Sequence, residues 1–184
     1  MHQTNLFSRK HILLVIVTVL ALSLMAIPAL AKGDKAPGDA TIYDIASSSP
    51  DFSTLAFALE ATGLDMALDN GGQFTVFAPT NAAFEKLEAE NPGTIAYLVA
   101  NPEVLESVLL YHVTDGRRWS NSLVNKNNPK DVEMLSGGMI TVTPSGMIMD
   151  TDSLGLMSPD ATIVAANVNA SNGVIHVIDE VLIP

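Results

Sequence analysis

The sequence predicts an α+β fold, because helix-like patterns dominate its first half and short strand-like runs dominate its second half. Between residues 52 and 63, apolar side chains recur at helical spacing and a glycine follows them. Beyond residue 130, alternating runs are separated by glycine-containing turns. The final run, 173–183, is apolar on both faces, which is typical of a strand in the middle of a sheet. We therefore expect a β-sandwich or a curled sheet packed by helices.

The first clear helix is expected between Pro50 and Gly63, since proline suits a first helical turn and glycine ends a helix. Its inward face is formed by Phe52, Leu55, Ala56 and Leu59. A strand over 73–78 follows, and a proline ends it. Thr80 or Asn81 can then cap another helix by accepting a backbone N–H bond. Two further short helices are predicted, over 94–100 and 102–109.

The strand-rich part is expected to open with an extended segment at 111–113, followed by an exposed polar loop at 120–130. Strand-like runs follow at 132–135, 139–143, 147–150 and 162–168. The last strand is launched by Asn172-Gly173, a pair that suits a tight turn because both residues tolerate positive φ. One face of that strand carries Val174, Ile178 and Leu182, and the other carries Ile175, Val177, Val181 and Ile183.

The N-terminus has the features of a secretory signal peptide. Arg9 and Lys10 precede an apolar run over 12–30, and Ala29-Leu30-Ala31 fits a small-residue cleavage site. An uncleaved membrane anchor is the alternative, because the run is close to the ~20 residues that span a bilayer. The sequence thus divides into a signal peptide at 1–31, a flexible linker at 32–40 and a domain at 41–184. We expect a secreted, extracellular, periplasmic or cell-surface protein.

The predicted mature chain is strongly acidic. Of nine basic residues, the loss of Arg9 and Lys10 leaves seven against 20 acidic ones, a net charge of −13. Such a surface repels nucleic acid and anionic membranes, so contact with a membrane is expected only through an uncleaved signal segment. The chain has no cysteine, which excludes a thiol nucleophile, a thiolate metal site and a disulfide.

Three segments taken together resemble the fasciclin (FAS1) domain family of the beta-Ig-H3/fasciclin proteins: 74–84, 109–113 and 170–184. Their order and spacing also match, and the resemblance spans about 41–184. The residues that carry the motifs include Thr75, Pro79, Thr80, Asn81, Asn172, Gly173, His176 and Asp179. The resemblance implies a wedge-shaped β-sandwich with helices at one edge. It also implies a non-catalytic adhesion module that needs no cofactor and binds an extracellular protein or a polysaccharide.

Two adhesive elements proposed for this family can be located in the sequence. The Tyr-His pair is present as Tyr111 and His112. An Asp-Ile pair, associated in animal relatives with integrin binding, corresponds here to Asn167 and Val168. The missing carboxylate argues against a metal-mediated integrin contact at this position.

The histidines offer an alternative function, an exported hydrolase or small-ligand carrier that uses His112 and His176. Each precedes an aspartate by three residues, a spacing that puts the two side chains on opposite faces of a strand. No G-x-S-x-G elbow accompanies them. We expect buried, hydrogen-bonded histidines instead, and no catalytic, metal or cofactor site. Tyr111 is either a surface contact or, as its apolar neighbours favour, a core ring whose hydroxyl meets a carbonyl.

Arg117, Arg118 and Trp119 form the densest basic spot of the chain and include its single tryptophan. An exposed tryptophan beside arginines can recognise a sugar ring or a protein, and it can equally be a loop anchor folded onto the core. Five methionines between 134 and 157 either bind copper(I) or, as their alternation favours, fill the core. Asp150, Asp152 and Asp160 lack a calcium-loop spacing, and Asn169 begins a glycosylation sequon.

Overall fold

The structure is a computed structural model and describes residues 39–70, 72–124, 128–150 and 160–184. The expected signal peptide, most of the expected linker, Asp152 and Met157 lie outside these residues. No helix within the described ranges combines the length and the apolar character needed to cross a membrane.

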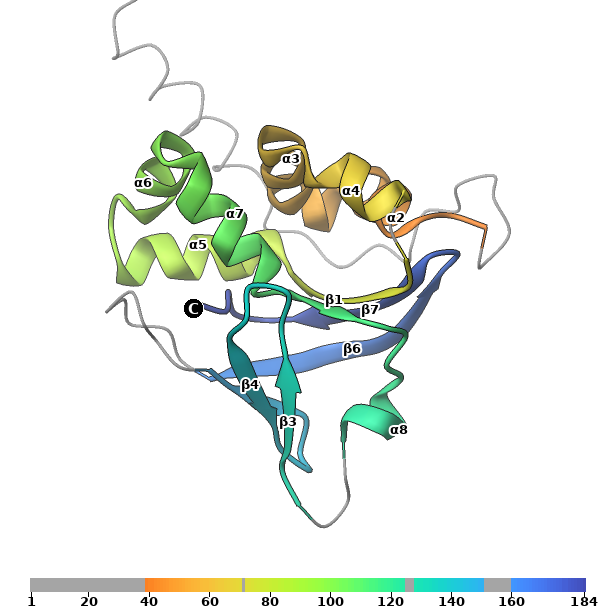
Figure 1. Cartoon of the computed structure of the whole chain (residues 1–184). Helices are drawn as coiled ribbons and strands as arrows, with labels where there is room; N and C mark the ends of the chain where they lie inside the picture. Colours follow the sequence, from red (N-terminus) through yellow and green to blue (C-terminus); the bar gives the residue numbers. More distant parts are fainter. Residues whose placement is uncertain (1–38, 71, 125–127, 151–159) are drawn as a thin grey trace, which may run out of the picture. The chain divides into compact units, whose positions relative to one another are not determined.

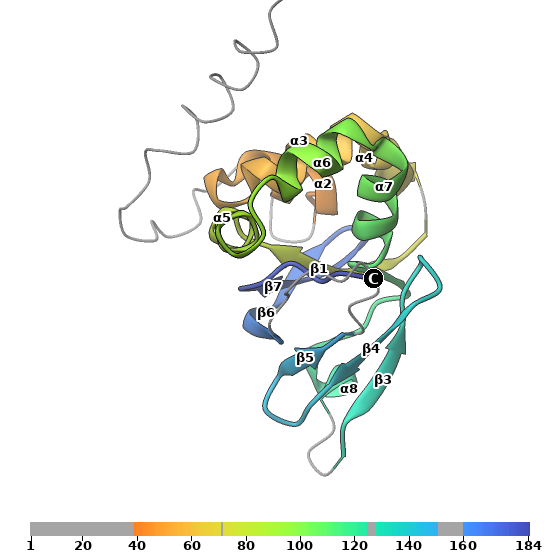
Figure 2. The same ribbon diagram turned by 90° about the vertical axis from the view of Figure 1, so that its left-hand side faces the viewer.

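Six α-helices and one 3₁₀ turn between residues 42 and 110 gather on one side of the sheet, as Figures 1 and 2 show. They are α2 (Ile42–Ser48), η1 (Pro50–Phe52), α3 (Ser53–Thr62), α4 (Leu64–Asn70), α5 (Asn81–Glu90), α6 (Thr94–Ala100) and α7 (Pro102–Leu110). Gly63 ends α3 in the left-handed region at φ 73°, as the sequence predicts. Thr80 caps α5, its hydroxyl accepting from the Ala83 amide at 3.4 Å.

The strands form a seven-stranded sheet in the order β2-β1-β7-β6-β5-β4-β3. They are β1 (Phe74–Pro79), β2 (Val113–Asp115), β3 (Lys130–Glu133), β4 (Met139–Val142), β5 (Met147–Met149), β6 (Ala161–Ala170) and β7 (Gly173–Ile178). β7 lies between β1, to which it is parallel, and β6, to which it is antiparallel. The α+β fold class and the central position of the last strand are both confirmed.

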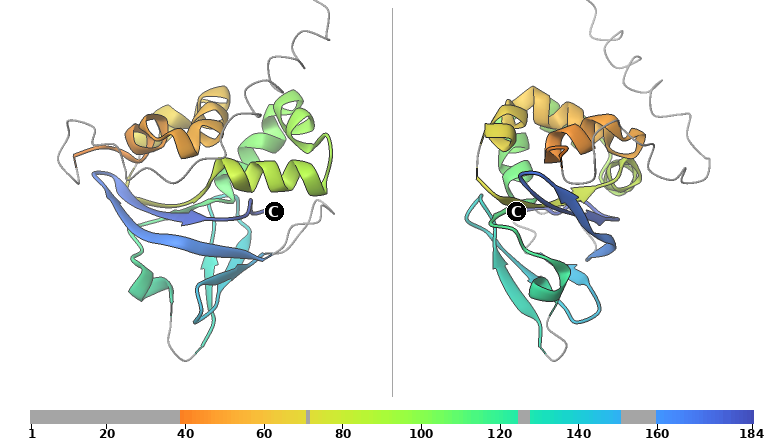
Figure 3. Two further views of the ribbon diagram at one scale, coloured as in Figure 1. Left: turned by 180° about the vertical axis from the view of Figure 1, so that it is seen from behind. Right: turned by 90° about the vertical axis from the view of Figure 1, so that its right-hand side faces the viewer.

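The sheet curls, so that its two halves enclose a second core. Figures 2 and 3 show the helices on one side of β1 and β7 and the ribbon β3–β5 on the other side. The helix side buries Val76, Ile175 and Ile183, whereas the inner side buries Phe77, Ile148 and Ile178. Bonds between the two edge strands join them: the Leu135 amide donates to the Val113 carbonyl, and the Thr114 hydroxyl to the Glu133 carbonyl, each at 2.7 Å. The two faces predicted for the last strand are thereby confirmed.

The last strand is shorter than the sequence predicts, because it ends at Ile178 and does not continue to the C-terminus. The Asp179 carboxylate accepts a bond from the Thr162 amide at 2.6 Å, and Lys86 pairs with Glu180 at 2.6 Å. These polar contacts lie at the bends of Asp179 and Glu180 that follow the strand. The segment after the bend still buries Leu182 on the inner side.

The turn before β7 also differs from its prediction. The two loop residues are Ser171 and Asn172, since Ala170 pairs directly with Gly173. Neither Asn172 nor Gly173 has a positive φ. A β-carbon on Gly173 would overlap the Phe74 carbonyl oxygen, so glycine is required here by the close approach of two strands. The buried Asn172 side chain accepts from the Ile42 amide at 2.8 Å and donates to the Leu68 carbonyl at 2.6 Å.

Two segments differ from their predicted backbone conformation. Tyr111 and His112 form a turn directly after α7, and extended structure begins only at Val113. The polar stretch that starts at Ser120 contains a short helix, α8 (Ser120–Leu123), whose Leu123 is fully buried. In both places a side chain that enters the core determines the backbone conformation.

Candidate functional site

His112 lies in the core, with both ring nitrogens bonded to the backbone. Its Nδ1–H donates to the Val108 carbonyl at 2.7 Å, and its Nε2 accepts from the Leu182 amide at 3.0 Å. This pattern fixes the neutral tautomer with the proton on Nδ1. Burial lowers the pKa of His112 to about 4, against the bond to Val108, which raises it. The ring thus joins the end of α7 to the C-terminal segment.

His176 is fully buried in β7, but only one of its nitrogens has a partner. Its Nε2–H donates to the Arg118 carbonyl at 2.9 Å, and its ring stacks on Phe77 with 5.7 Å between centroids. Its Nδ1 has no hydrogen-bond partner within the ranges that the structure describes. Burial lowers the pKa of His176, while the bond to the Arg118 carbonyl raises it. The expectation that both histidines are buried and bonded to the backbone is confirmed.

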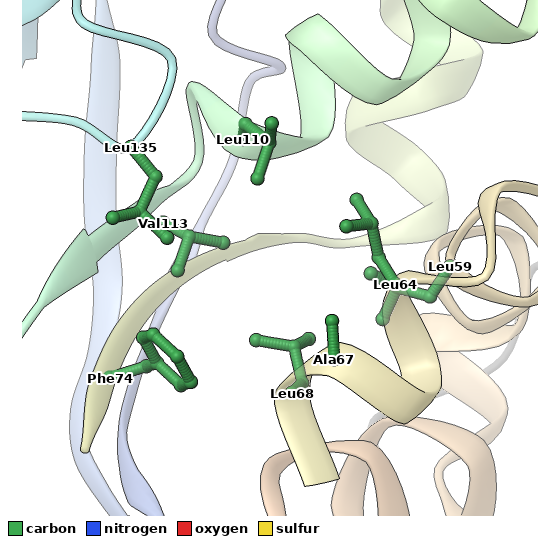
Figure 4. A pocket seen from close by; sticks show the side chains of 8 residues that line it. All are labelled: Leu59, Leu64, Ala67, Leu68, Phe74, Leu110, Val113 and Leu135. Carbon is green, nitrogen blue, oxygen red and sulfur yellow. The ribbon is translucent and has the colours of Figure 1, made fainter. Parts of the chain in front are cut away.

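The alternative function, an exported hydrolase or small-ligand carrier, depends on His112 and His176, and the structure does not support a role for them in it. Neither histidine lines the pocket of Figure 4, which has an empty volume of about 300 Å³. Its walls are apolar side chains from α3, α4, α7, the first two strands and the chain after β3: Leu59, Leu64, Ala67, Leu68, Phe74, Leu110, Val113 and Leu135. Such a lining offers no acid, base or nucleophile. No group of three or more potential metal ligands occurs among the described residues.

The Tyr-His pair is not a surface element. Tyr111 is 1% exposed and His112 is 2% exposed, so the assignment of these two residues to partner binding is wrong for the folded domain. The Tyr111 hydroxyl donates to the Met139 carbonyl at 2.9 Å, which is the core role that its apolar neighbours favour. The ring also packs in the inner core with Phe77 and Ile140. Both residues support the fold.

Arg117 is bound into the fold by most of its guanidinium group. Its Nε donates to Gln73 Oε1 and its Nη1 to Asn169 Oδ1, both at 3.0 Å. Its Nη2 donates to the carbonyls of Ala170 and Ser171 at 2.8 and 3.1 Å. These bonds connect the chain after β2 to the turn between β6 and β7. Arg117 is therefore a structural cross-link.

Arg118 is held mainly through its backbone. Its amide donates to Thr75 Oγ1 at 2.8 Å, and its carbonyl accepts from His176. The Thr75 hydroxyl in turn donates to the Gly116 carbonyl at 2.7 Å. The Arg118 Nε donates to the Asp115 carbonyl at 3.1 Å, and no other hydrogen bond of the guanidinium occurs with the part of the chain that the structure describes.

Trp119 follows at the N-cap of α8 and is 36% exposed. Its ring lies 6.0 Å from the Arg117 guanidinium carbon, within cation–π range. The next residue is tied to β6, because the Ser120 amide donates to Asn167 Oδ1 at 2.8 Å and Asn167 Nδ2 donates to the Ser120 hydroxyl at 2.7 Å. Asn167 is exposed and has φ 64°, a left-handed conformation that asparagine tolerates.

These contacts gather four of the predicted site residues on one surface: Arg117, Arg118, Trp119 and Asn167. We call it the Trp119 surface. Val168 is only half-buried and packs against the helix-side core. The sequence did not indicate that Asn167 meets Ser120 or that Thr75 and His176 hold Arg118. A polar residue inside an otherwise apolar strand was the available signal for both Thr75 and His176.

The other motif residues have structural roles. Pro79 closes β1 just before the Thr80 cap. Asn81 accepts from the Thr54 amide at 3.0 Å and donates to the Pro50 carbonyl at 2.8 Å, and so ties α5 to the start of α3. Asp179 ends the last strand through its bond to Thr162. Together they fix the ends of helices and strands.

The prediction that the methionines fill the core is wrong for three of them. Met134 is buried, but Met139, Met147 and Met149 are 52%, 39% and 40% exposed, so these three do not fill the core. Alternation puts Ile140 and Ile148 inward and the methionines outward. The Asp150 carboxylate accepts from the Ile183 amide at 2.8 Å.

The fold resembles a FAS1 domain pair from the insect cell adhesion molecule Fasciclin I. The TM-score is 0.66 at 19% sequence identity, with 80% of this chain and 52% of that chain covered. At this identity the likeness concerns the fold alone.

Sequence comparison then defines the family. The Fasciclin domain family matches residues 50–184. Protein sll1483 of Synechocystis is 36% identical over 146 residues, which cover 78% of this chain and 73% of that protein. Transforming growth factor-beta-induced protein ig-h3 of Sus scrofa is 34% identical over 143 residues, 78% of this chain and 19% of that protein. The chain belongs to the fasciclin domain family, as the three sequence segments predict.

Proposed function

We propose that this chain is an exported, non-catalytic adhesion module that binds an extracellular protein or polysaccharide through the Trp119 surface. The observation that carries the proposal is the exposed Trp119 ring on a segment bonded to β1, β6 and β7. Aromatic and arginine side chains are enriched among residues that dominate binding energy. A segment held by the fold loses little conformational entropy on binding.

Membership of the fasciclin domain family supports an adhesive function, since the structurally similar FAS1 domain pair comes from a cell adhesion molecule. The buried, backbone-bonded histidines support action without turnover. Export is supported by the basic and apolar pattern of residues 1–31.

A pull-down from the extracellular fraction of the source cells tests the binding surface. Trp119→Ala should lose the partners that the wild-type chain recovers, because truncation removes the exposed ring. Tyr97→Ala is the matched control, since Tyr97 is an exposed aromatic residue (56%) on α6. Equal recovery of every partner by the Trp119 variant would remove this surface from the adhesive site.

Mass spectrometry of the exported protein tests the localisation. Cleavage after Ala31 should give a mature N-terminus at Lys32. Recovery of the chain only in the membrane fraction, with residues 1–31 intact, would favour the anchor instead.

A further inference from the structure

We propose that the Trp119 surface recognises an acidic polysaccharide, in which a sugar ring stacks on Trp119 and a neighbouring carboxylate or sulfate binds the Arg118 guanidinium. This inference rests on the proposed function and names the partner class for the same surface. It follows from the local charge, the Nη groups of Arg118 and the rigid placement of the two side chains.

The local charge around Trp119 opposes that of the whole chain. The chain carries nine basic and 20 acidic residues, yet the stretch 115–131 carries Arg117, Arg118, Lys126 and Lys130 against two acidic residues, Asp115 and Asp131. In the structure, Lys130 Nζ bonds the Ser122 carbonyl at the end of α8. A cationic region attracts an anionic ligand to this place, whereas the acidic remainder of the protein repels it.

The two arginines have different capacities for a ligand. Arg117 donates from Nε, Nη1 and Nη2 to groups of the fold, so its guanidinium is largely satisfied. Among the described residues, the Arg118 guanidinium bonds only through Nε, to the Asp115 carbonyl. Its two Nη groups form the planar fork that matches a carboxylate or sulfate in a bidentate contact.

Trp119 supplies the second contact. Its ring is exposed at the N-cap of α8, one residue from Arg118. The apolar face of a sugar ring can stack on indole, while the acidic substituent of the same or the next sugar reaches the arginine. Poly-L-glutamate offers carboxylates without a ring, so its binding separates recognition of charge alone from recognition of an acidic sugar.

The fold holds this pair in place before any ligand arrives. Thr75 binds the Arg118 amide, His176 binds the Arg118 carbonyl and Asn167 binds Ser120. Thr75 and His176 are each 0% exposed, so the clamp is protected from solvent. Preorganisation of this kind lowers the entropic cost of binding.

The test measures binding of the purified chain to immobilised polygalacturonate, alginate, dextran sulfate, neutral dextran and poly-L-glutamate. We expect binding to the acidic polysaccharides, no binding to neutral dextran, and weaker binding as salt increases. Preference between the two uronates and dextran sulfate distinguishes carboxylate from sulfate recognition.

Variants then assign the contacts. Trp119→Ala and Arg118→Gln should each weaken binding about tenfold. Arg118→Lys should recover only part of the loss, because lysine keeps the charge without the fork. Tyr97→Ala and Lys86→Gln are the controls for an exposed aromatic and for a charge on α5, and their affinity should match that of the wild type.

Wild-type affinity in both the Trp119 and Arg118 variants would overturn the proposal, as would equal binding to poly-L-glutamate or to neutral dextran. If the acidic polysaccharides fail but the pull-down remains sensitive to Trp119→Ala, the surface is adhesive and its partner is a protein. If the pull-down is also insensitive, the proposed function fails as well.

Discussion

His112 and His176 are both buried in the sheet region, but they hold different parts of the molecule. His112 bonds Val108 at the end of α7 and Leu182 near the C-terminus, so both of its nitrogens serve the core. His176 bonds the Arg118 carbonyl beneath the Trp119 surface and leaves Nδ1 unpaired. One histidine mainly stabilises the fold, whereas the other supports an exposed segment. Changes at the two sites should therefore separate stability from binding.

The largest effect is expected from His112→Ala. Loss of the ring leaves a cavity and removes the acceptor of the Leu182 amide, which should cost about 3 kcal/mol in free energy of unfolding. Urea denaturation followed by circular dichroism measures this change. A loss below about 1 kcal/mol would show that the C-terminal segment does not depend on the His112 cross-link.

Stability should also fall in acid. The pKa of His112 is about 4 in the folded chain and about 6.5 when unfolded, so the unfolded chain binds protons more readily between these values. The stability contributed by the neutral ring is fully present above pH 6.5 and is lost as the pH falls towards 4. The loss is about 3 kcal/mol, and the lowered pKa of His176 acts in the same direction.

Urea denaturation of the wild type and of His112→Gln at pH 7 and pH 4.5 checks this dependence. The variant should lose less stability between the two pH values than the wild type loses. Parallel losses in the two proteins would exclude His112 as the main titrating group.

Thr75→Val is expected to have an intermediate effect. The substitution keeps the shape of the side chain but removes the hydroxyl that binds the Arg118 amide and the Gly116 carbonyl, which should cost about 2 kcal/mol. Hydrogen exchange should accelerate at the Arg118 amide more than in β7. Uniform acceleration throughout the sheet would mean that Thr75 stabilises the whole fold rather than the segment.

His176→Phe should have the smallest effect on stability, about 1 kcal/mol or less. It removes the bond to the Arg118 carbonyl, but it also removes the unpaired Nδ1 and keeps a ring beside Phe77. Binding through the Trp119 surface should nevertheless weaken, because the Arg118 backbone loses one support. Unchanged binding with unchanged stability would contradict the role of His176 in positioning the Arg118 backbone.

The sequence correctly predicts those helices and strands that are determined by residues within them or at their ends. Gly63 and Thr80 set helix ends as expected, and the alternation in β1 and β7 distributes side chains to the two cores. β7 is shorter than its apolar run predicts, and the contacts at its end come from Thr162 and Lys86, which are distant in sequence. The role of Gly173 was likewise misjudged, since it depends on the approach of Phe74.

The candidate site was predicted in part. The composition of residues 117–119 indicated recognition, and the structure places them beside Asn167. Tyr111 and His112 were included through family resemblance, although their burial makes them structural. Periodicity gave Met139, Met147 and Met149 a shared face but could not show that this face is exposed. Which face of a strand meets the core depends on the curl of the sheet, and that is a property of the whole chain.

Trp119 is the only tryptophan of the chain, so its fluorescence reports directly on the proposed site. Titration of the purified chain with polygalacturonate should produce a saturable change in emission and protect the ring from acrylamide quenching. Neutral dextran should produce neither effect. An emission spectrum and a quenching rate that stay constant up to a concentration that saturates binding would contradict recognition through the Trp119 surface.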